Sequence, residues 1–267
     1  MSDEISSRSL LLRLMTPLRM CVSVHPGPVD VEIVVILKQH DFEHTPVLDV
    51  PGTVRTSYLE QLLAAGAPLS PDDPAITRIL LDAGTELEQA LETVAVENAV
   101  LVVHNGSLAG LLTLSDLNKH ALRSVLYAFF ANLEVDLAET ISRLCPDPWE
   151  WIPQLPEDQQ VHVIGYWEVT KRKGVDIGPL AGCTLTQLLK TIASIEKLRQ
   201  EFGFKNRKAA EEVCGSLPML RNSVMHPVRP LVTKPEDVQQ IVRSIRNLNH
   251  LTGTLAAKKT ATSMGCP

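Results

Sequence analysis

The stretch Gly110-Leu111-Leu112-Thr113-Leu114-Ser115-Asp116-Leu117 ends a short apolar strand and opens a helix. An earlier stretch, Gly52-Thr53-Val54-Arg55-Thr56-Ser57-Tyr58-Leu59, superposes on it at an offset of 58 residues. Self-similarity at a fixed offset indicates an internal repeat. We therefore predict two copies, at about residues 10–66 and 75–118, joined by a proline-rich linker.

The elements expected in both copies are short. The first copy has a helix at about 31–40, strands at 45–48 and 54–57, and a helix over 58–65 that ends at Gly66. The second has a helix at 85–97 and strands at 99–103 and 108–113, separated by the hairpin turn His104-Asn105-Gly106. Residues 1–118 are therefore predicted to be α+β.

The rest of the chain has the pattern of an all-α domain. Apolar residues at three- and four-residue spacing predict a long helix over 122–144, which Cys145-Pro146 ends. Thr184-x-x-Gln187 and Thr233-x-x-Glu236 are capping boxes that open two further helices. Between these two, helices are expected from near residue 206, with an interruption at 215–216, and over 217–226. We predict a helical bundle over 119–256 and a flexible tail over 257–267.

Composition excludes several classes of protein. Of the 267 residues, 45% are apolar and 21% are charged, which is typical of a folded chain. No run approaches the roughly 18 apolar residues of a membrane helix. The five cysteines and the histidines show no spacing typical of metal ligands, so we expect no metal site. We expect a cytoplasmic protein with reduced thiols and no membrane partner.

Charge is divided unevenly along the chain. Residues 1–116 hold 6 Lys+Arg against 16 Asp+Glu, whereas residues 117–267 hold 19 against 15. The second part is therefore better suited to a polyanion such as RNA. Its basic clusters, which either follow an RNA backbone or are simply solvated, are Lys171, Arg172, Lys173, Lys205, Arg207 and Lys208.

The repeat resembles a known family. A Gly, two apolar residues, Thr or Ser, two more residues and then Asp, as in Gly110 to Asp116, is similar to the strand-to-helix signature of the cystathionine-β-synthase (CBS) domain. The resemblance implies that two copies pack into one module whose cleft, in many members, holds an adenine nucleotide or related adenosyl ligand. It also implies that Thr113 and Asp116 contact the phosphate or ribose of that ligand.

The residues are consistent with this role and also with a simpler one. An ionised Asp116 can accept hydrogen bonds from both ribose hydroxyls, but Thr113-x-x-Asp116 is equally a capping box. The first copy has Arg55 and Tyr58 at the two positions, so it lacks the carboxylate and at most one good site per chain is expected. Arg55 is a candidate to neutralise a phosphate bound at the facing copy.

A second resemblance lies near the C-terminus. The sequence Leu220-Arg221-Asn222-Ser223-Val224-Met225-His226-Pro227 resembles the RNxxxH hallmark of HEPN domains (higher eukaryotes and prokaryotes nucleotide-binding). The resemblance implies an HEPN-like bundle over residues 119–256, a homodimer and, in many members, metal-independent RNA endonuclease activity with toxin or defence roles.

The residue types suit RNA cleavage by the 2′-hydroxyl. His226 can act as a general acid or base, and its place at the end of its helix favours the acid. Arg221 can stabilise the phosphate, and Asn222 can orient the imidazole or contact the phosphate. Arg221 and His226 lie about 140° apart on an ideal helix, which favours a composite site formed by two chains. In the alternative, Arg221 pairs with a surface acid and His226 only caps its helix.

Two classes of function therefore remain open. The first is a ligand-regulated RNA endonuclease that needs no cofactor for catalysis and in which an adenine-type nucleotide is the regulator. In that case, we expect the helix after Asp116 to continue into the first helix of the bundle and to couple the two parts. The second is a non-catalytic, nucleotide-sensing regulatory protein in which both parts only bind and dimerise.

Overall fold

The structure is a computed structural model that describes residues 7–175 and 177–264. Its residues group into two compact units. The first unit comprises the chain up to Arg123 together with Pro230–Val242, and the second comprises Ser124–Arg229 and the chain from Arg243 onward. The segment 230–242, which we expected within the helical bundle, is thus grouped with the first unit.

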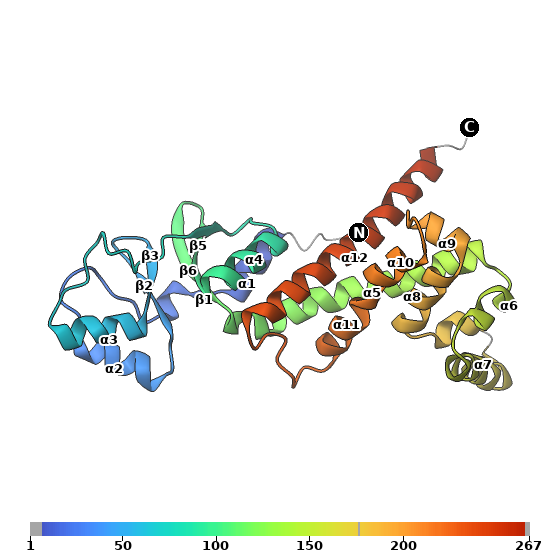
Figure 1. The fold of residues 1–267 in the computed structure, drawn as a ribbon, viewed down its shortest axis with the longest axis horizontal. Coiled ribbons are helices and arrows are strands. Elements are labelled where there is room, and N and C mark those ends of the chain that lie inside the picture. The colour runs from blue at the N-terminus through green and yellow to red at the C-terminus, as the bar shows by residue number, and fades with distance from the viewer. Residues whose placement is uncertain (1–6, 176, 265–267) are drawn as a thin grey trace. The chain divides into compact units, whose positions relative to one another are not determined.

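The first unit holds two small sheets (Figure 1). In the four-stranded sheet, of order β1-β6-β5-β4, β5 pairs with β6 in antiparallel fashion and with β4 in parallel. Its strands are β1 Thr16–Pro17, β4 Leu80–Asp82, β5 Ala99–His104 and β6 Ser107–Thr113. The other sheet is the antiparallel pair β2 His44–Val47 and β3 Gly52–Arg55.

Short helices accompany these strands. They are α1 Ser7–Leu14, η1 Leu18–Met20, α2 Val31–Gln39, α3 Thr56–Ala65, α4 Leu87–Glu97 and η2 Ser115–Asn118. In the first copy, α2 and α3 pack on β2 and β3 through buried aliphatic residues such as Leu37, Val54 and Leu59. Gly66 ends α3 in the left-handed conformation, with φ of 61°, which a residue without a Cβ adopts at little cost.

The two copies have the same order of elements. Helix α2 ends at Gln39 and α4 at Glu97, and strand β3 ends at Arg55 and β6 at Thr113. Both pairs of ends are separated by the offset that the sequence shows between Gly52 and Gly110.

Each copy also lends its leading segment to a strand of the other copy. Thr16, near the start of the first copy, pairs with Leu111 of β6, and Thr77, near the start of the second copy, pairs with Thr53 of β3. Both pairings are antiparallel. Each places the backbone of one copy beside a glycine of the other copy, Gly110 before Leu111 and Gly52 before Thr53. The two copies are therefore held together by a reciprocal exchange of backbone hydrogen bonds.

The junction after Asp116 corrects one expectation. The turn η2 is a 3-10 helix of one turn, and Lys119 after it is extended, with ψ of 150°. The helix α5 begins separately and spans His120–Leu144. The helix that we expected to run from Asp116 into the bundle is thus interrupted, because an extended residue cannot continue the helical hydrogen bonds.

The second unit is all-α, as the spacing of apolar residues predicts. Besides the larger parts of α5 and of α12 Pro235–Met264, its helical elements are α6 Pro148–Trp151, η3 Ile152–Gln154, α7 Glu157–Arg172, η4 Pro179–Gly182, α8 Leu185–Ser194, α9 Glu196–Glu201, α10 Arg207–Gly215 and α11 Leu217–Met225. The capping box at Thr184 and Gln187 is confirmed. Helix α7 escaped prediction because Val163 is its only buried residue, so its sequence lacks an apolar stripe.

Two details near the C-terminus differ from expectation. Thr233 pairs with Asp237 rather than Glu236: the Asp237 carboxylate accepts hydrogen bonds from the Thr233 backbone and hydroxyl at 2.8 and 2.7 Å. Helix α12 continues through Gly253 to Met264. Most of the predicted tail over 257–267 is therefore helical, and residues 265–267 lie outside the described residues. No helix among the described residues has the length and apolarity to cross a bilayer.

Candidate functional site

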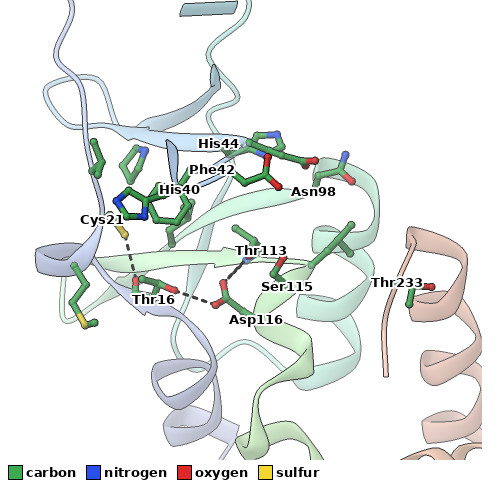
Figure 2. Close-up of a pocket in the computed structure, with 17 residues that line it drawn as sticks. Thr16, Cys21, His40, Phe42, His44, Asn98, Thr113, Ser115, Asp116 and Thr233 are labelled. Atoms are coloured by element: carbon green, nitrogen blue, oxygen red, sulfur yellow. Dashed lines mark hydrogen bonds between the residues drawn. The ribbon is translucent and has the colours of Figure 1, made fainter. Parts of the chain in front are cut away.

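A cavity of about 580 Å³ opens in the first unit between the β6–η2 turn and the segment 40–44 that links α2 to β2. Figure 2 shows Thr113, Ser115 and Asp116 on one wall, with His40, Phe42 and His44 on the other. Thr16, Cys21 and Asn98 also line the cavity. The turn between strand and helix in one copy thus faces the turn between helix and strand in the other copy.

Asp116 makes more polar contacts than the other labelled side chains of this site. Its residue surface is only 5% exposed. One carboxylate oxygen, Oδ1, accepts a hydrogen bond from the Thr16 hydroxyl at 3.1 Å and lies 2.6 Å from the Lys119 ammonium. The other, Oδ2, accepts hydrogen bonds from the backbone N–H and the hydroxyl of Thr113 at 2.8 and 3.0 Å.

These four contacts occupy the acceptor capacity of the carboxylate, which offers about four lone-pair positions. A ribose hydroxyl would have to displace the Thr16 hydroxyl or the Lys119 ammonium to reach it. The contact with the Thr113 N–H is one half of the capping box named in the sequence, although Leu114 rather than Thr113 is the cap residue of η2. In this structure Asp116 therefore holds the turn and the exchanged Thr16 segment in place.

The opposite wall carries the Phe42 ring and the imidazoles of His40 and His44, together with the carboxylates of Asp41 and Glu43. The rings of His40 and Phe42 are stacked with their centroids 5.5 Å apart, and Phe42 is 43% exposed. Burial lowers the pKa of His44 below its usual value, and the positive charge of Arg55 lowers it further. An anion bound here would oppose both effects and favour the protonated imidazole.

Arg55 lies away from this cavity. It lines a neighbouring cavity of about 420 Å³ together with Tyr58, Thr77 and Asn98, which is the counterpart of the first cavity in the other copy. Tyr58, at the position of Asp116, donates a hydrogen bond to Asp73 of the proline-rich linker at 2.8 Å, and this bond raises the pKa of Tyr58. Both cavities are lined by His44 and Asn98, so they adjoin.

The Arg–His motif lies at the end of α11. The Nε of Arg221 donates a hydrogen bond to Glu134 on α5 at 3.2 Å, and each of these two side chains is 32% exposed. Asn222 and His226 are exposed, and His226 is the residue that ends the helix. This arrangement agrees with the alternative in which Arg221 pairs with a surface acid and His226 only caps its helix. All three side chains are nevertheless within reach of solvent.

The two basic clusters are exposed. Lys171 lies over the ring of Trp167, with Nζ 5.6 Å from the ring centroid. Arg207 forms an ion pair with Glu211 at 2.7 Å. Lys173 ends α7, and Lys205 and Lys208 flank the start of α10.

The sequence did not single out several residues of the cavity. The sequence offers His40 and His44 only as possible metal ligands, and it carries no local signal for Thr16 and Phe42 or for Lys119, which pairs with Asp116. The repeat does point to some of them. Its offset of 58 residues aligns His40 with Asn98 and Arg55 with Thr113, so cavity residues of the two copies occupy equivalent positions. Among the described residues, no three His, Cys, Asp or Glu side chains are grouped as metal ligands.

The sequence matches no protein-family model, and no curated protein matches it. Among solved structures, the chain is similar to the CBS domain of the bacterial CNNM/CorC family Mg²⁺ transporter, determined in complex with ATP. The identity is 17% and the TM-score 0.33, over 45% of this chain and 98% of that one.

Proposed function

We propose that the first unit binds an adenine-type nucleotide and that the chain is a nucleotide-sensing regulatory protein. The observation that carries this proposal is the cavity at the β6–η2 turn, formed where two copies of a repeat meet. Its volume of about 580 Å³ is in the range typical of sites for small ligands. Its aromatic, hydroxyl and imidazole groups are those that a nucleotide needs.

Each part of the ligand has a candidate partner. The stacked His40 and Phe42 rings offer a face for the purine, and base–aromatic stacking contributes roughly 1–3 kcal/mol. Ser115 and Asn98 offer polar groups to the ribose. Arg55 in the adjoining cavity offers positive charge to the phosphates, and the His44 imidazole, whose pKa is lowered, offers a ring N–H. Asp116 acts through Thr113 and Thr16, which it holds in position.

Isothermal titration of the full chain with ATP, ADP and AMP tests the proposal. We expect binding that weakens in Phe42→Ala and Asp116→Ala and is unchanged in Trp149→Ala, a similarly exposed aromatic residue of the second unit. GTP serves as the comparison for base selectivity. If none of the adenine nucleotides binds at millimolar concentration, the proposal is wrong.

The second candidate is the metal-independent RNA endonuclease that the RNxxxH resemblance implies. The observation that favours it is the accessibility of Arg221, Asn222 and His226 at the end of α11. In a homodimer, Arg221 of one chain would stabilise the phosphate while His226 of the other protonates the leaving 5′-oxygen. Such a site would use no metal.

Incubation of the full chain with total RNA in EDTA tests this candidate. Cleavage that survives chelation but is lost in both Arg221→Ala and His226→Ala supports the enzyme. Cleavage that persists in both variants identifies a contaminating nuclease. If the wild type cleaves no RNA, with or without adenine nucleotides, the endonuclease candidate is wrong and the non-catalytic regulatory protein remains.

A further inference from the structure

Helix α7 presents one whole face to solvent. On an ideal helix, this face consists of Gly165 and the four residues within about 40° of it, and all five are exposed: Asp158, Val161, Gly165, Val169 and Arg172. The two valines are 67% and 50% exposed, so the face has an apolar centre. The opposite side of the helix carries Val163, which is fully buried. The outer face is therefore not part of the packing of its own unit.

Gly165 is at the middle of this face, where its own unit does not require a glycine. A Cβ at this position would meet no heavy atom within 4 Å, and glycine within a helix costs about 1 kcal/mol relative to alanine. A glycine with open space before it allows the backbone of a second helix to approach closely.

The sequence of α7 is complementary to itself when reversed about Gly165. In an antiparallel pair of α7 helices that cross at Gly165, residues at equal distances before and after it lie at the same level. Asp158 is then level with Arg172 of the second copy, and Val161 with Val169 of the second copy. His162 is level with Glu168 of the second copy, and each relationship occurs twice because of the two-fold axis.

We propose that the outer face of α7 is the interface at which a second copy of this chain docks, antiparallel and with the two Gly165 residues at the crossing. Apolar contact at the valines and opposite charges at both ends of the face complement each other. The parallel arrangement would instead bring Asp158 against Asp158 and Arg172 against Arg172. The interface involves neither the nucleotide cavity nor the RNxxxH motif, so it does not depend on the proposed function.

Sedimentation velocity of the full chain over a dilution series tests the interface. We expect a dimer whose dissociation constant rises about tenfold or more in Asp158→Arg and in Arg172→Asp. The double variant with both changes restores the opposite charges, so its affinity should return to near that of the wild type. Glu212→Arg, an equally large change of charge at an exposed residue of α10, is the matched control and should leave the dimer unchanged.

Gly165→Leu separates loss of docking from loss of folding. The open space before Gly165 allows the side chain within one copy, and leucine favours the helix, so the thermal unfolding midpoint should be maintained or raised. The same side chain would block the crossing, and the variant should be monomeric. A wild-type chain that is monomeric throughout, or a dimer insensitive to Gly165→Leu and to both charge reversals, would overturn the proposal.

Discussion

Gly52 and Gly110 occupy equivalent positions in the two copies, and each has the leading segment of the other copy packed against its Cα. A Cβ on Gly110 would lie 2.3 Å from the carbonyl oxygen of Thr16, and a Cβ on Gly52 would lie 2.9 Å from that of Thr77. Both distances are shorter than a Cβ tolerates. The two glycines are thus required by the exchange that joins the copies, rather than by a turn.

Alanine at either glycine should destabilise the first unit. We expect Gly110→Ala to lower the free energy of unfolding by about 1–3 kcal/mol, because overpacking against backbone forces the strands apart. Gly52→Ala should have a similar or smaller effect, since its nearest contact is the Ile76 side chain at 2.5 Å. Urea unfolding followed by far-UV circular dichroism measures both; tryptophan fluorescence would not, because Trp149, Trp151 and Trp167 all belong to the second unit.

The control for this pair is Gly253→Ala on α12, where a Cβ meets nothing within 4 Å. Stability should be unchanged or increased by about 1 kcal/mol there, because alanine favours the helix. Equal stability in Gly110→Ala and the wild type would contradict the close approach of β1 to β6.

Removal of the Asp116 carboxylate should destabilise the first unit by roughly 1–3 kcal/mol, because the Thr113 backbone N–H loses its acceptor and the Lys119 ammonium loses its ionic partner, keeping only the Leu14 carbonyl and the Thr16 hydroxyl as acceptors. Lys119→Met alone should also destabilise. The double variant should lose less than the two single losses added together, since both remove one interaction. A double-mutant cycle measured by urea unfolding gives this coupling, and strict additivity would argue against the ion pair.

Acidification should lower stability through His44. Its pKa is lowered in the folded state, chiefly by burial and then by Arg55, so the unfolded chain binds a proton at a higher pH than the folded one. The free energy of unfolding therefore falls as the pH drops below about 6.5 towards the lower pKa of the folded state. His44→Gln should reduce this decline. An unaltered pH profile in His44→Gln would count against a lowered pKa of this half-buried imidazole.

Cys183 and Cys214 should resist alkylation in the native protein. Burial raises the pKa of both thiols to about 12, so at pH 8 only about one in 10⁴ is thiolate, the reactive form. Iodoacetamide labelling followed by peptide mass spectrometry should find both unmodified until the protein is unfolded. Rapid native labelling of either residue would show that the second unit opens more readily than its packing indicates.

Glu134→Gln isolates the role of the Arg221 ion pair. Because both side chains are partly exposed, stability should change by no more than about 1 kcal/mol. If the RNxxxH motif cleaves RNA, the freed guanidinium should maintain or increase the metal-free rate, which Arg221→Ala abolishes. A Glu134→Gln variant that loses cleavage as completely as Arg221→Ala, without loss of stability, would show that the pair itself positions the arginine.

Local patterns predicted much of the fold. Helices with clear boundaries, such as α5 before Cys145-Pro146 and α8 at its Thr184 cap, carry their start and stop signals within a few residues. The hairpin at Asn105-Gly106 is equally local. Helix α7 lacked such a signal, and the break at Lys119 between η2 and α5 has none that a spacing pattern detects.

The amino-acid sequence by itself determined the repeat, the helical second part and the residues of the RNxxxH motif, because these depend on the type and spacing of near neighbours. Only the tertiary structure decided that His40 and Phe42 face Thr113, that Thr16 and Lys119 occupy the Asp116 carboxylate, and that Arg221 meets Glu134. Apart from the pair of Asp116 and Lys119, which are three residues apart, these contacts join residues far apart in the chain. Their geometry is set by the reciprocal strand exchange and by helix packing, for which no short stretch of sequence encodes the partner.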